Sequence, residues 1–353
     1  MHFNSRFRAA IRHSLIVSIA LVQAVLLPMA SAVSHSNGTA AMLEWESSPS
    51  RSLYLYKDTT ANEPRFLPTS NMTEIKAGER WYVETNSYGL MAYMSGVRLE
   101  NPSLKTYGAN LLEFAIQHQQ DDGEFPEKHD IHHSAAFYYE ATARFLMMCR
   151  EPGFAEGVSS QTIEHLRNGL RKGVIWFGKE TSWNDRFWRD NMHHRFLLNA
   201  SVIFLAQKVL GDLPEDTLAQ AYRWLQIAID RQLPDGAMTE LGGPDTGYQA
   251  LGITFATGIL MAGVLPEPMQ NRVELLVKKG ADWLTGMISV EGRIDDSANT
   301  RNGGRGNEMN RTDGKPKGVK PYEHAFALEG AGLYFNESPY LEAADRIMLA
   351  YHP

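Results

Sequence analysis

Cysteine and basic charge are both scarce in this sequence. Its 353 residues contain one cysteine, Cys149, so no disulfide can form within the chain and stability must come from a packed core. A lone thiol in the apolar segment FLMMCR is typical of packing and not of a nucleophile. Lys and Arg number 34 against 41 Asp and Glu. This acidic balance argues against a general nucleic-acid binder, because neutralising phosphates needs a basic surface.

Alternation of apolar and polar residues, the pattern of half-buried strands, is also rare, and no apolar run reaches the ~20 residues that span a membrane. Apolar residues recur instead at helical spacing from about residue 66 onward. The sequence therefore predicts an all-α domain over residues 66–353. We expect its helices near residues 86–97, 103–120, 134–149, 158–177, 191–210, 214–232, 246–263, 267–287, 321–335 and 339–351.

One kind of turn recurs at the ends of these helices. The segment WLQIAIDRQL ends at a Pro-Asp-Gly turn within Gln232–Met238, and similar turns lie at Gln119–Phe125 and, more loosely, at Ser289–Ile294. Their glycines are spaced by about one or two periods of roughly 56 residues, and a further turn occurs near Gly178, where this period places it. The domain is thus predicted to be five repeated helix pairs.

These Q-x-x-D-G-x-aromatic turns resemble the repeat turns of terpenoid cyclases, prenyltransferase β subunits and helical-barrel polysaccharide lyases and hydrolases. The resemblance implies an incomplete α/α toroid of five to six helix pairs. It extends over roughly 80% of the chain and identifies a fold and not a single family. The D-x-D-D motif of a cyclase and the zinc ligands of a prenyltransferase have no counterpart here, which leaves the carbohydrate-active group.

The helices of each pair differ in character. Those after the turns, such as GITFATGILMAG, are apolar on most faces, and those before the turns, such as EDTLAQAYRWLQIAIDRQ, carry a polar stripe. A helix that is apolar all round is buried, whereas an amphipathic helix faces solvent on one side. We therefore expect an inner and an outer layer.

The N-terminus predicts export. Residues 1–32 combine a basic start, the apolar run LIVSIALVQAVLL and the cleavage site Ala30-Ser31-Ala32, as in a secretory signal peptide. The mature protein is expected to begin near Val33, to be secreted or periplasmic, and to be free of the membrane after cleavage. Residues 33–65 are predicted to form an N-terminal arm on the surface.

Polar residues gather where the inner helices are expected to start. Taken singly, these residues are explained as helix caps or turn formers. Their equivalent placement in successive repeats favours one shared site. The candidates are His133, His194, Tyr248 and His324 for catalysis and Arg189, Asn191, Arg195, Glu240, Arg293, Arg301 and Arg311 for substrate binding.

Histidine, tyrosine, arginine and asparagine together suit removal of a proton next to a carboxylate. A neutral histidine, His194 or His133, takes the C5 proton of a uronate, and Tyr248 gives a proton to the leaving oxygen. Arg189, Asn191 and Arg195 neutralise the carboxylate. The basic loop from Arg293 to Lys320 fits a polyanion. We therefore expect a monomeric polysaccharide lyase that cleaves an acidic glycan by β-elimination without a cofactor.

Three alternatives remain open at the level of sequence. A glycoside hydrolase on the same fold would use paired carboxylates from Asp185, Glu240, Asp245, Asp295 and Asp296. The histidines of HDIHH (His129, His132 and His133) and of MHH (His193 and His194) also offer imidazoles to zinc, although H-x-x-H-H is not a specific zinc spacing. A non-catalytic glycan-binding or assembly protein is the third alternative.

Overall fold

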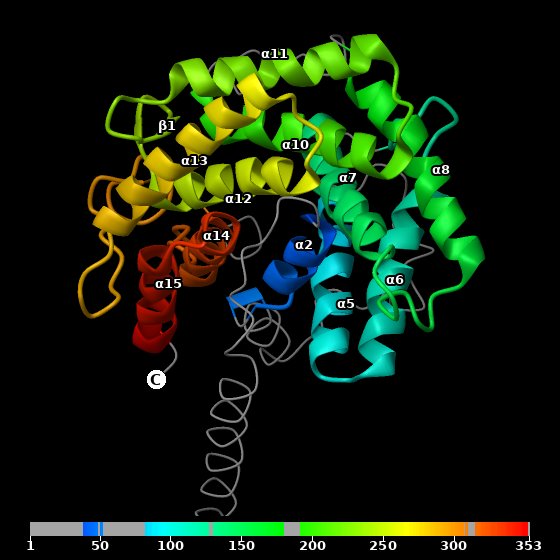
Figure 1. The fold of residues 1–353 in the computed structure, drawn as a ribbon, viewed down its shortest axis with the longest axis horizontal. Helices are drawn as coiled ribbons and strands as arrows, with labels where there is room; N and C mark the ends of the chain where they lie inside the picture. The colour runs from blue at the N-terminus through cyan, green and yellow to red at the C-terminus, as the bar shows by residue number, and fades with distance from the viewer. Residues whose placement is uncertain are drawn as a thin grey trace, which may run out of the picture. The chain divides into compact units, whose positions relative to one another are not determined.

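The computed structural model describes residues 38–48, 50–51, 82–126, 130–179, 191–306, 308–309 and 315–351. All of them belong to one compact unit, Gly38–Pro353. This part of the chain is mostly helical, as predicted (Figure 1). The helices are α2 (Gly38–Glu46), α4 (Tyr82–Asn86), α5 (Tyr88–Arg98), α6 (Pro102–Gln117), α7 (Ile131–Met148), α8 (Ser160–Phe177), α10 (His193–Leu210), α11 (Glu215–Arg231), α12 (Thr246–Ala262), α13 (Glu267–Gly286), α14 (Pro321–Phe335) and α15 (Ser338–Tyr351).

Each of the ten predicted helices is present, and their ends lie within three residues of the predicted ones. Local chemistry explains several of the starts. The side chain of Asn101 accepts hydrogen bonds from the backbone of Ser103 and Leu104 at the start of α6, and Ser159 caps α8 in the same way. Pro102 at the first position of α6 leaves no unpaired backbone donor. No helix among the described residues is long and apolar enough to cross a membrane.

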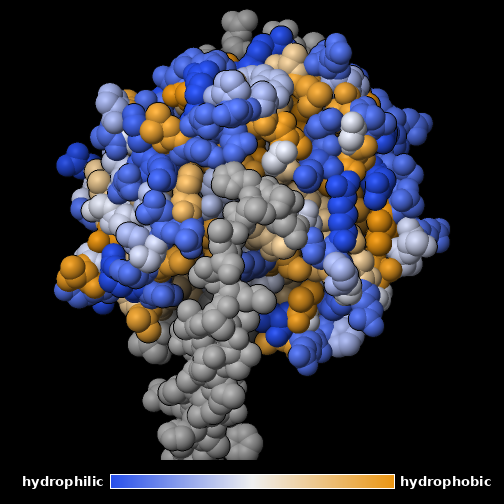
Figure 2. All heavy atoms as spheres, viewed as in Figure 1, coloured by the Kyte–Doolittle hydropathy of each residue, from blue (hydrophilic) through white to orange (hydrophobic). Residues whose placement is uncertain are grey.

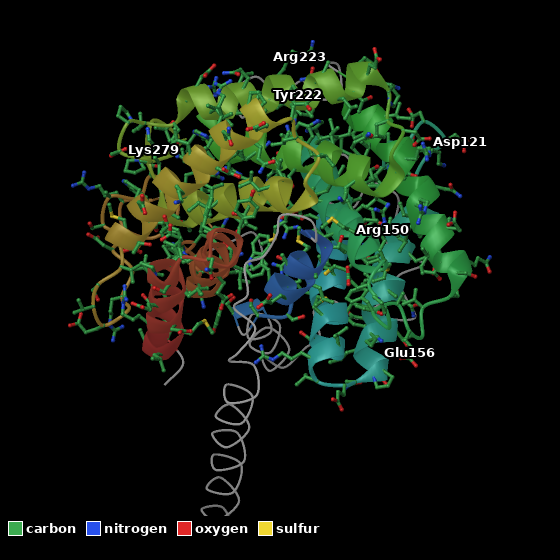
Figure 3. The ribbon with its side chains drawn as sticks, viewed as in Figure 1. Asp121, Arg150, Glu156, Tyr222, Arg223 and Lys279 are labelled. Atoms are coloured by element: carbon green, nitrogen blue, oxygen red, sulfur yellow. The ribbon has the colours of Figure 1, made fainter. Side chains whose placement is uncertain are left out.

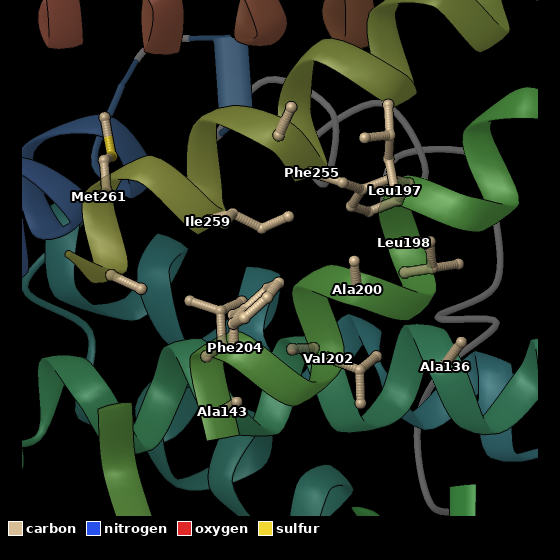
Figure 4. Close-up of a cluster of buried hydrophobic side chains, with 14 of the residues drawn as sticks. Ala136, Ala143, Leu197, Leu198, Ala200, Val202, Phe204, Phe255, Ile259 and Met261 are labelled. Atoms are coloured by element: carbon tan, nitrogen blue, oxygen red, sulfur yellow. The ribbon is translucent and has the colours of Figure 1, made fainter. Parts of the chain in front are cut away.

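The expected difference between the two kinds of helix is confirmed. α7, α10, α12 and α14 are buried along nearly their whole length, and each packs against the next. α8, α11, α13 and α15 each bury one stripe and expose the other side to solvent. In Figure 4, Phe204 of α10 and Ile259 of α12 meet in the core that these inner helices share.

The outer surface is mixed in character. On the face drawn in Figure 2, apolar side chains are interspersed among hydrophilic ones. Figure 3 places Asp121 and Arg223 at the periphery, and Asp121 is exposed. The acidic pair Asp121-Asp122 therefore lies at the surface and not in the interior.

The recurring turn has a specific structural role. In the turn Gln232–Met238, Gly236 has a φ of +97° and lies very close to α13. A Cβ added to it would stand 2.1 Å from the carbonyl oxygen of Lys279. Gln232 of the same turn donates to the carbonyl oxygens of Gly236 and Leu276, at 3.1 and 2.9 Å. Gly123 and Gly292 also have positive φ and meet α8 and α15 in the same manner. The motif thus docks each turn onto the outer helix of the following pair.

The N-terminal segment departs from the prediction. Residues 33–65 were expected to form a surface arm, but α2 lies in the interior and contacts α7, α12 and α14 (Figure 1). Met42, Trp45 and Glu46 are fully buried. The prediction is wrong for residues 38–48 and 50–51 because Trp45 stacks on Phe326 of α14 at 4.5 Å, a contact between segments far apart in sequence. Residues 1–37 and 52–81 lie outside the described residues.

Candidate functional site

A short hairpin brings a glutamate to the start of α10. β1 (Thr239–Glu240) and β2 (Gly243–Pro244) pair antiparallel through a two-residue turn in which Leu241 and Gly242 both have positive φ. The backbone of Met192 bridges to that of Glu240, and Leu241 N donates to the carbonyl oxygen of Asn191 at 2.9 Å. Glu240 is thereby held beside the first turn of α10, where it is fully buried.

Glu240 is shared by His194 and Arg301. Its Oε1 lies 2.6 Å from His194 Nδ1 and accepts the backbone N–H of His194 at 3.0 Å. Its Oε2 accepts from Arg301 Nη1 at 3.1 Å. A carboxylate at Nδ1 requires that nitrogen to carry the proton, which leaves the lone pair on Nε2. Among the described residues, no group forms a hydrogen bond to Nε2.

Tyr248, near the start of α12, lies against this group. Its ring centroid is 4.5 Å from that of His194, and Arg301 Cζ is 3.6 Å from the same tyrosine ring. The Tyr248 hydroxyl donates to Glu308 Oε2 at 2.7 Å and accepts from Lys317 Nζ at 2.9 Å. A histidine, a tyrosine and two cations are thus gathered around one point.

Asp245 fixes the loop that carries Arg301. One of its carboxylate oxygens caps α12 by accepting from the backbone of Gly247 and Tyr248. The other accepts from the backbone of Arg301 and Asn302, at 2.8 and 3.0 Å. Burial raises the pKa of Asp245, and its backbone hydrogen bonds from Asn302, Arg301 and Tyr248 oppose that rise. Asp245 is therefore a structural residue that positions Arg301.

Burial and charge set the protonation states of the site. Burial lowers the pKa of His194, an effect that Glu240 only partly offsets, so the imidazole is neutral near pH 7. Burial alone would raise the pKa of Glu240, but His194 and Arg301 bring it below its ordinary value. Burial also raises the pKa of Tyr248 well above 10. The site therefore pairs a neutral histidine with a protonated phenol.

Other predicted residues lie nearby. Arg195 is buried and pairs with Asp130, the residue directly before α7, at 2.7 Å between Nη2 and Oδ2. The ring of His133 lies 6.1 Å from that of His194. Asn191 is exposed two residues before α10. The structure thus brings together His194, Tyr248, Glu240 and Arg301, with His133, Arg195 and Asn191 around them.

The remaining candidates are elsewhere or outside the described residues. His324 is fully buried in α14, and its Nδ1 lies 2.9 Å from the carbonyl oxygen of Lys320 in its own first turn. Arg293 is exposed in the last repeat turn, where its backbone binds Ser289. Arg189 and Arg311 lie outside the described residues, as do Asp185 and His129.

Two histidines of the clusters have structural surroundings. His132 stacks on Phe177 at 4.0 Å, and burial lowers its pKa to about 3. His193 is buried beside α11, and burial lowers its pKa to about 4. Within the described part of the chain, no group of three or more His, Cys, Asp or Glu side chains is placed to hold a metal ion.

Sequence reasoning missed Glu308 and Lys317. The backbones of the two residues are paired, because Lys317 N donates to the carbonyl oxygen of Glu308 at 2.7 Å. Next to this pair, Met309 and Pro316 form an antiparallel β-bridge. The dipeptide Asp313-Gly314 between them is a hairpin-turn signal that could have paired them. Arg301, Lys317 and Lys320 each pair with a glutamate, so these cations of the predicted basic loop are already neutralised.

A surface hollow of about 500 Å³ lies apart from these residues, lined by Val97, Lys105, Phe154 and Val158 among others. None of the predicted site residues lines it. No family model, curated protein or solved structure matches this chain. The functional inference therefore rests on the side chains around His194 and Tyr248.

Proposed function

We propose that this protein is an exported polysaccharide lyase that cleaves an acidic, uronate-containing glycan by β-elimination. One observation carries the proposal. His194, oriented through Nδ1 by Glu240, lies against Tyr248, with its ring 4.5 Å from the tyrosine ring and two cations beside the phenol. A base, an acid and positive charge are the three things that removal of a proton next to a carboxylate requires.

The base in this proposal is His194. Nε2 takes the proton from C5 of the uronate, and the electrons of the C5–H bond form the C4–C5 double bond. The imidazolium that results is stabilised by the Glu240 carboxylate at Nδ1. The ring of His133, the other histidine considered, lies 6.1 Å from that of His194.

The acid is Tyr248. As the C4–O4 bond breaks, the oxygen of the leaving sugar takes the phenol proton. The phenolate that remains is stabilised by Lys317, 2.9 Å from the hydroxyl oxygen, and by Arg301 over the ring. Solvent then restores the proton to Tyr248 and removes the one on His194. Asn191 is exposed at the edge of the same group, where further sugars of the polymer would pass.

The architecture supports the same class of enzyme. Five helix pairs with inner helices in succession fit an incomplete α/α toroid, and we propose that arrangement here. In such a toroid the inner helices start at one mouth, where His194 and Tyr248 lie one residue and two residues into α10 and α12. Export follows in this proposal from the signal-like residues 1–32, and places the mature monomer in the periplasm or outside the cell.

A glycoside hydrolase is less well supported. It needs one carboxyl group held protonated and a second one free to act. Both oxygens of Glu240 and both oxygens of Asp245 are already hydrogen-bonded, and the pKa of Glu240 is lowered. Asp295 is an exposed surface residue. Glu240 and Asp245 thus serve to orient other groups.

The test is ultraviolet absorbance of the C4–C5 double bond during incubation of the mature protein with a panel of uronate polysaccharides. We expect the absorbance to rise with the wild type and to be lost, by at least about a hundredfold in rate, in His194→Ala and Tyr248→Phe. His118→Ala, which removes an exposed histidine directly after α6, is the matched control. Reducing ends without absorbance would indicate hydrolysis, and neither signal on any glycan would favour a binding protein.

A further inference from the structure

Three donors converge on the carboxylate of Glu308. Tyr248 OH lies 2.7 Å from Oε2, Arg301 Nη2 lies 3.3 Å from the same oxygen, and Lys317 Nζ lies 3.2 Å from Oε1. Two cations and a phenol around one carboxylate are the surroundings expected of a bound acid and not of a surface glutamate. The Glu308 and Lys317 side chains are 22% and 24% exposed, so this point is open to solvent.

The three donors are held by contacts that do not involve the Glu308 side chain. Arg301 is fixed by Glu240 and, through its backbone, by Asp245. Tyr248 belongs to α12, and the backbone of Lys317 accepts from Gly303 N at 2.8 Å. The Glu308 carboxylate, in contrast, sits on a side chain with several rotatable bonds at the solvent edge. Its rotation outward would leave the donors in place.

We propose that Arg301, Lys317 and Tyr248 form the binding site for a ligand carboxylate, and that the side chain of Glu308 occupies this site in the empty protein. The proposal rests on the function proposed above only in taking the ligand to be a uronate. When the sugar carboxylate replaces that of Glu308, Arg301 and Lys317 neutralise it and the Tyr248 hydroxyl donates to it instead. The substrate is then held against Tyr248, whose phenol proton passes to the leaving oxygen as the C4–O4 bond breaks.

Charge favours a monocarboxylate as the ligand. Glu240 and Glu308 together balance Arg301 and Lys317, and Arg301 is only 8% exposed. A ligand with one negative charge restores this balance when Glu308 leaves. A phosphate dianion would add an uncompensated charge at a partly buried position, which is unfavourable.

The test is chemical rescue of Glu308→Ala, which leaves the cations without their carboxylate. We expect the variant to melt below the wild type, and acetate or glucuronate to raise its Tm in a saturable manner at constant ionic strength. Glucose and sodium chloride should have no such effect. Glu337→Ala, which removes the carboxylate that pairs with the half-exposed Lys278 at 3.1 Å, is the matched control and should show no rescue.

Two further variants complete the design. Glu308→Ala combined with Lys317→Met should lose the rescue. Glu308→Gln, which keeps the side-chain shape, should bind glucuronate at least about tenfold more tightly than the wild type by calorimetry, so the site can be tested even where the alanine variant does not fold. Equal effects of carboxylates on the Glu308 and Glu337 variants, or equal rescue by inorganic phosphate, would overturn the proposal.

The two proposals fail separately. Carboxylate rescue of Glu308→Ala without elimination on any uronate glycan would retain the binding site and reject the lyase. Elimination by the wild type, together with no rescue and an unchanged KM in Glu308→Gln, would retain the lyase and reject this site.

Discussion

His194 and Arg301 bind opposite oxygens of one fully buried carboxylate. The contact of Glu240 Oε1 with His194 Nδ1 determines which ring nitrogen of the histidine carries the proton. The contact of Oε2 with Arg301 holds the guanidinium over Tyr248, with Cζ 3.6 Å from the centroid of the tyrosine ring. Glu240 therefore determines both the state of the proposed base and the position of the cation beside the proposed acid, without itself reaching the substrate.

Glu240→Gln tests this role at the level of one residue. The amide keeps the shape but removes the fully buried one of the two carboxylates that pair with Arg301, and removing one partner of a buried pair costs up to about 3–5 kcal/mol. Glu240 has a lowered pKa in the folded protein, so its contribution is present above its unfolded pKa near 4.5 and is lost as pH falls through the folded value. We therefore expect a large loss of unfolding free energy at pH 7 that narrows below about pH 4.5.

The measurement is urea unfolding of the wild type and of Glu240→Gln at pH 7 and at pH 4. Glu215→Gln, in the exposed first turn of α11, is the control and should change stability by less than about 0.5 kcal/mol. A deficit of the same size at pH 7 and at pH 4 would show that shape and not charge makes Glu240 important.

At the scale of secondary structure, the features that depend on residues close together in the sequence can be predicted from it. The ten main helices follow from apolar periodicity, and their two layers follow from how much of each helix is apolar, as in α11 and α12. α2 could not be predicted in this way. Its nine residues are too few for a clear period, and its burial depends on Trp45 meeting Phe326, 281 residues away.

The same distinction applies to the candidate site. His194 and Tyr248 could be predicted to share a site because each lies at the start of an inner helix. Glu308 and Lys317 could not, since they reach Tyr248 from a loop whose path depends on the contact of Asp245 with the backbone of Arg301. His324 also lies at a helix start, but its Nδ1 contacts the backbone of that first turn.

The contact between α14 and the segment after α2 predicts a pH effect. Glu329 of α14 is hydrogen-bonded by Ser50, faces Asp345 of α15 and interacts with Arg98 of α5. Burial raises its pKa from 4.5 to about 7. The folded protein binds the proton of Glu329 more tightly than the unfolded chain does. This difference stabilises the fold at low pH, and the stabilisation is lost as pH rises from about 4.5 to about 7.

Glu329→Gln should remove this dependence. The unfolding free energy of the wild type, taken relative to the variant, is expected to fall by about 3 kcal/mol across that interval. Urea midpoints at pH 5 and pH 7.5 give the comparison, and the effects of other titrating groups cancel because both proteins share them. Glu337→Gln, at a half-exposed ion pair, should follow the wild type at both pH values. Parallel pH curves for Glu329→Gln and the wild type would refute the assignment.

At the scale of the whole molecule, α2 connects helices that are not neighbours in the repeat. Repeats that contact only adjacent repeats unfold in parts, because few interactions join the two ends. α2 contacts α7, α12 and α14 together. Arg144 of α7 pairs with the buried Glu46 at 2.9 Å, and Trp45 donates to the carbonyl oxygen of Phe326 in α14 at 2.7 Å. Through α2, these contacts couple the helix pair α7 and α8 to the last pair, α14 and α15.

Trp45→Ala should therefore reduce both stability and cooperativity. The indole is fully buried between Phe326 and the guanidinium of Arg144, and Gly330 leaves the space that it fills. Its removal is expected to cost roughly 3–5 kcal/mol. Urea unfolding of the wild type should give coincident transitions by circular dichroism and tryptophan fluorescence, and the two transitions of Trp45→Ala should separate.

Trp283→Ala, which removes a partly buried indole from the outer helix α13, is the control and should lower the midpoint while the two signals stay coincident. If Trp45→Ala also kept them coincident, the coupling of the two ends would have to come from the inner helices themselves and not from α2.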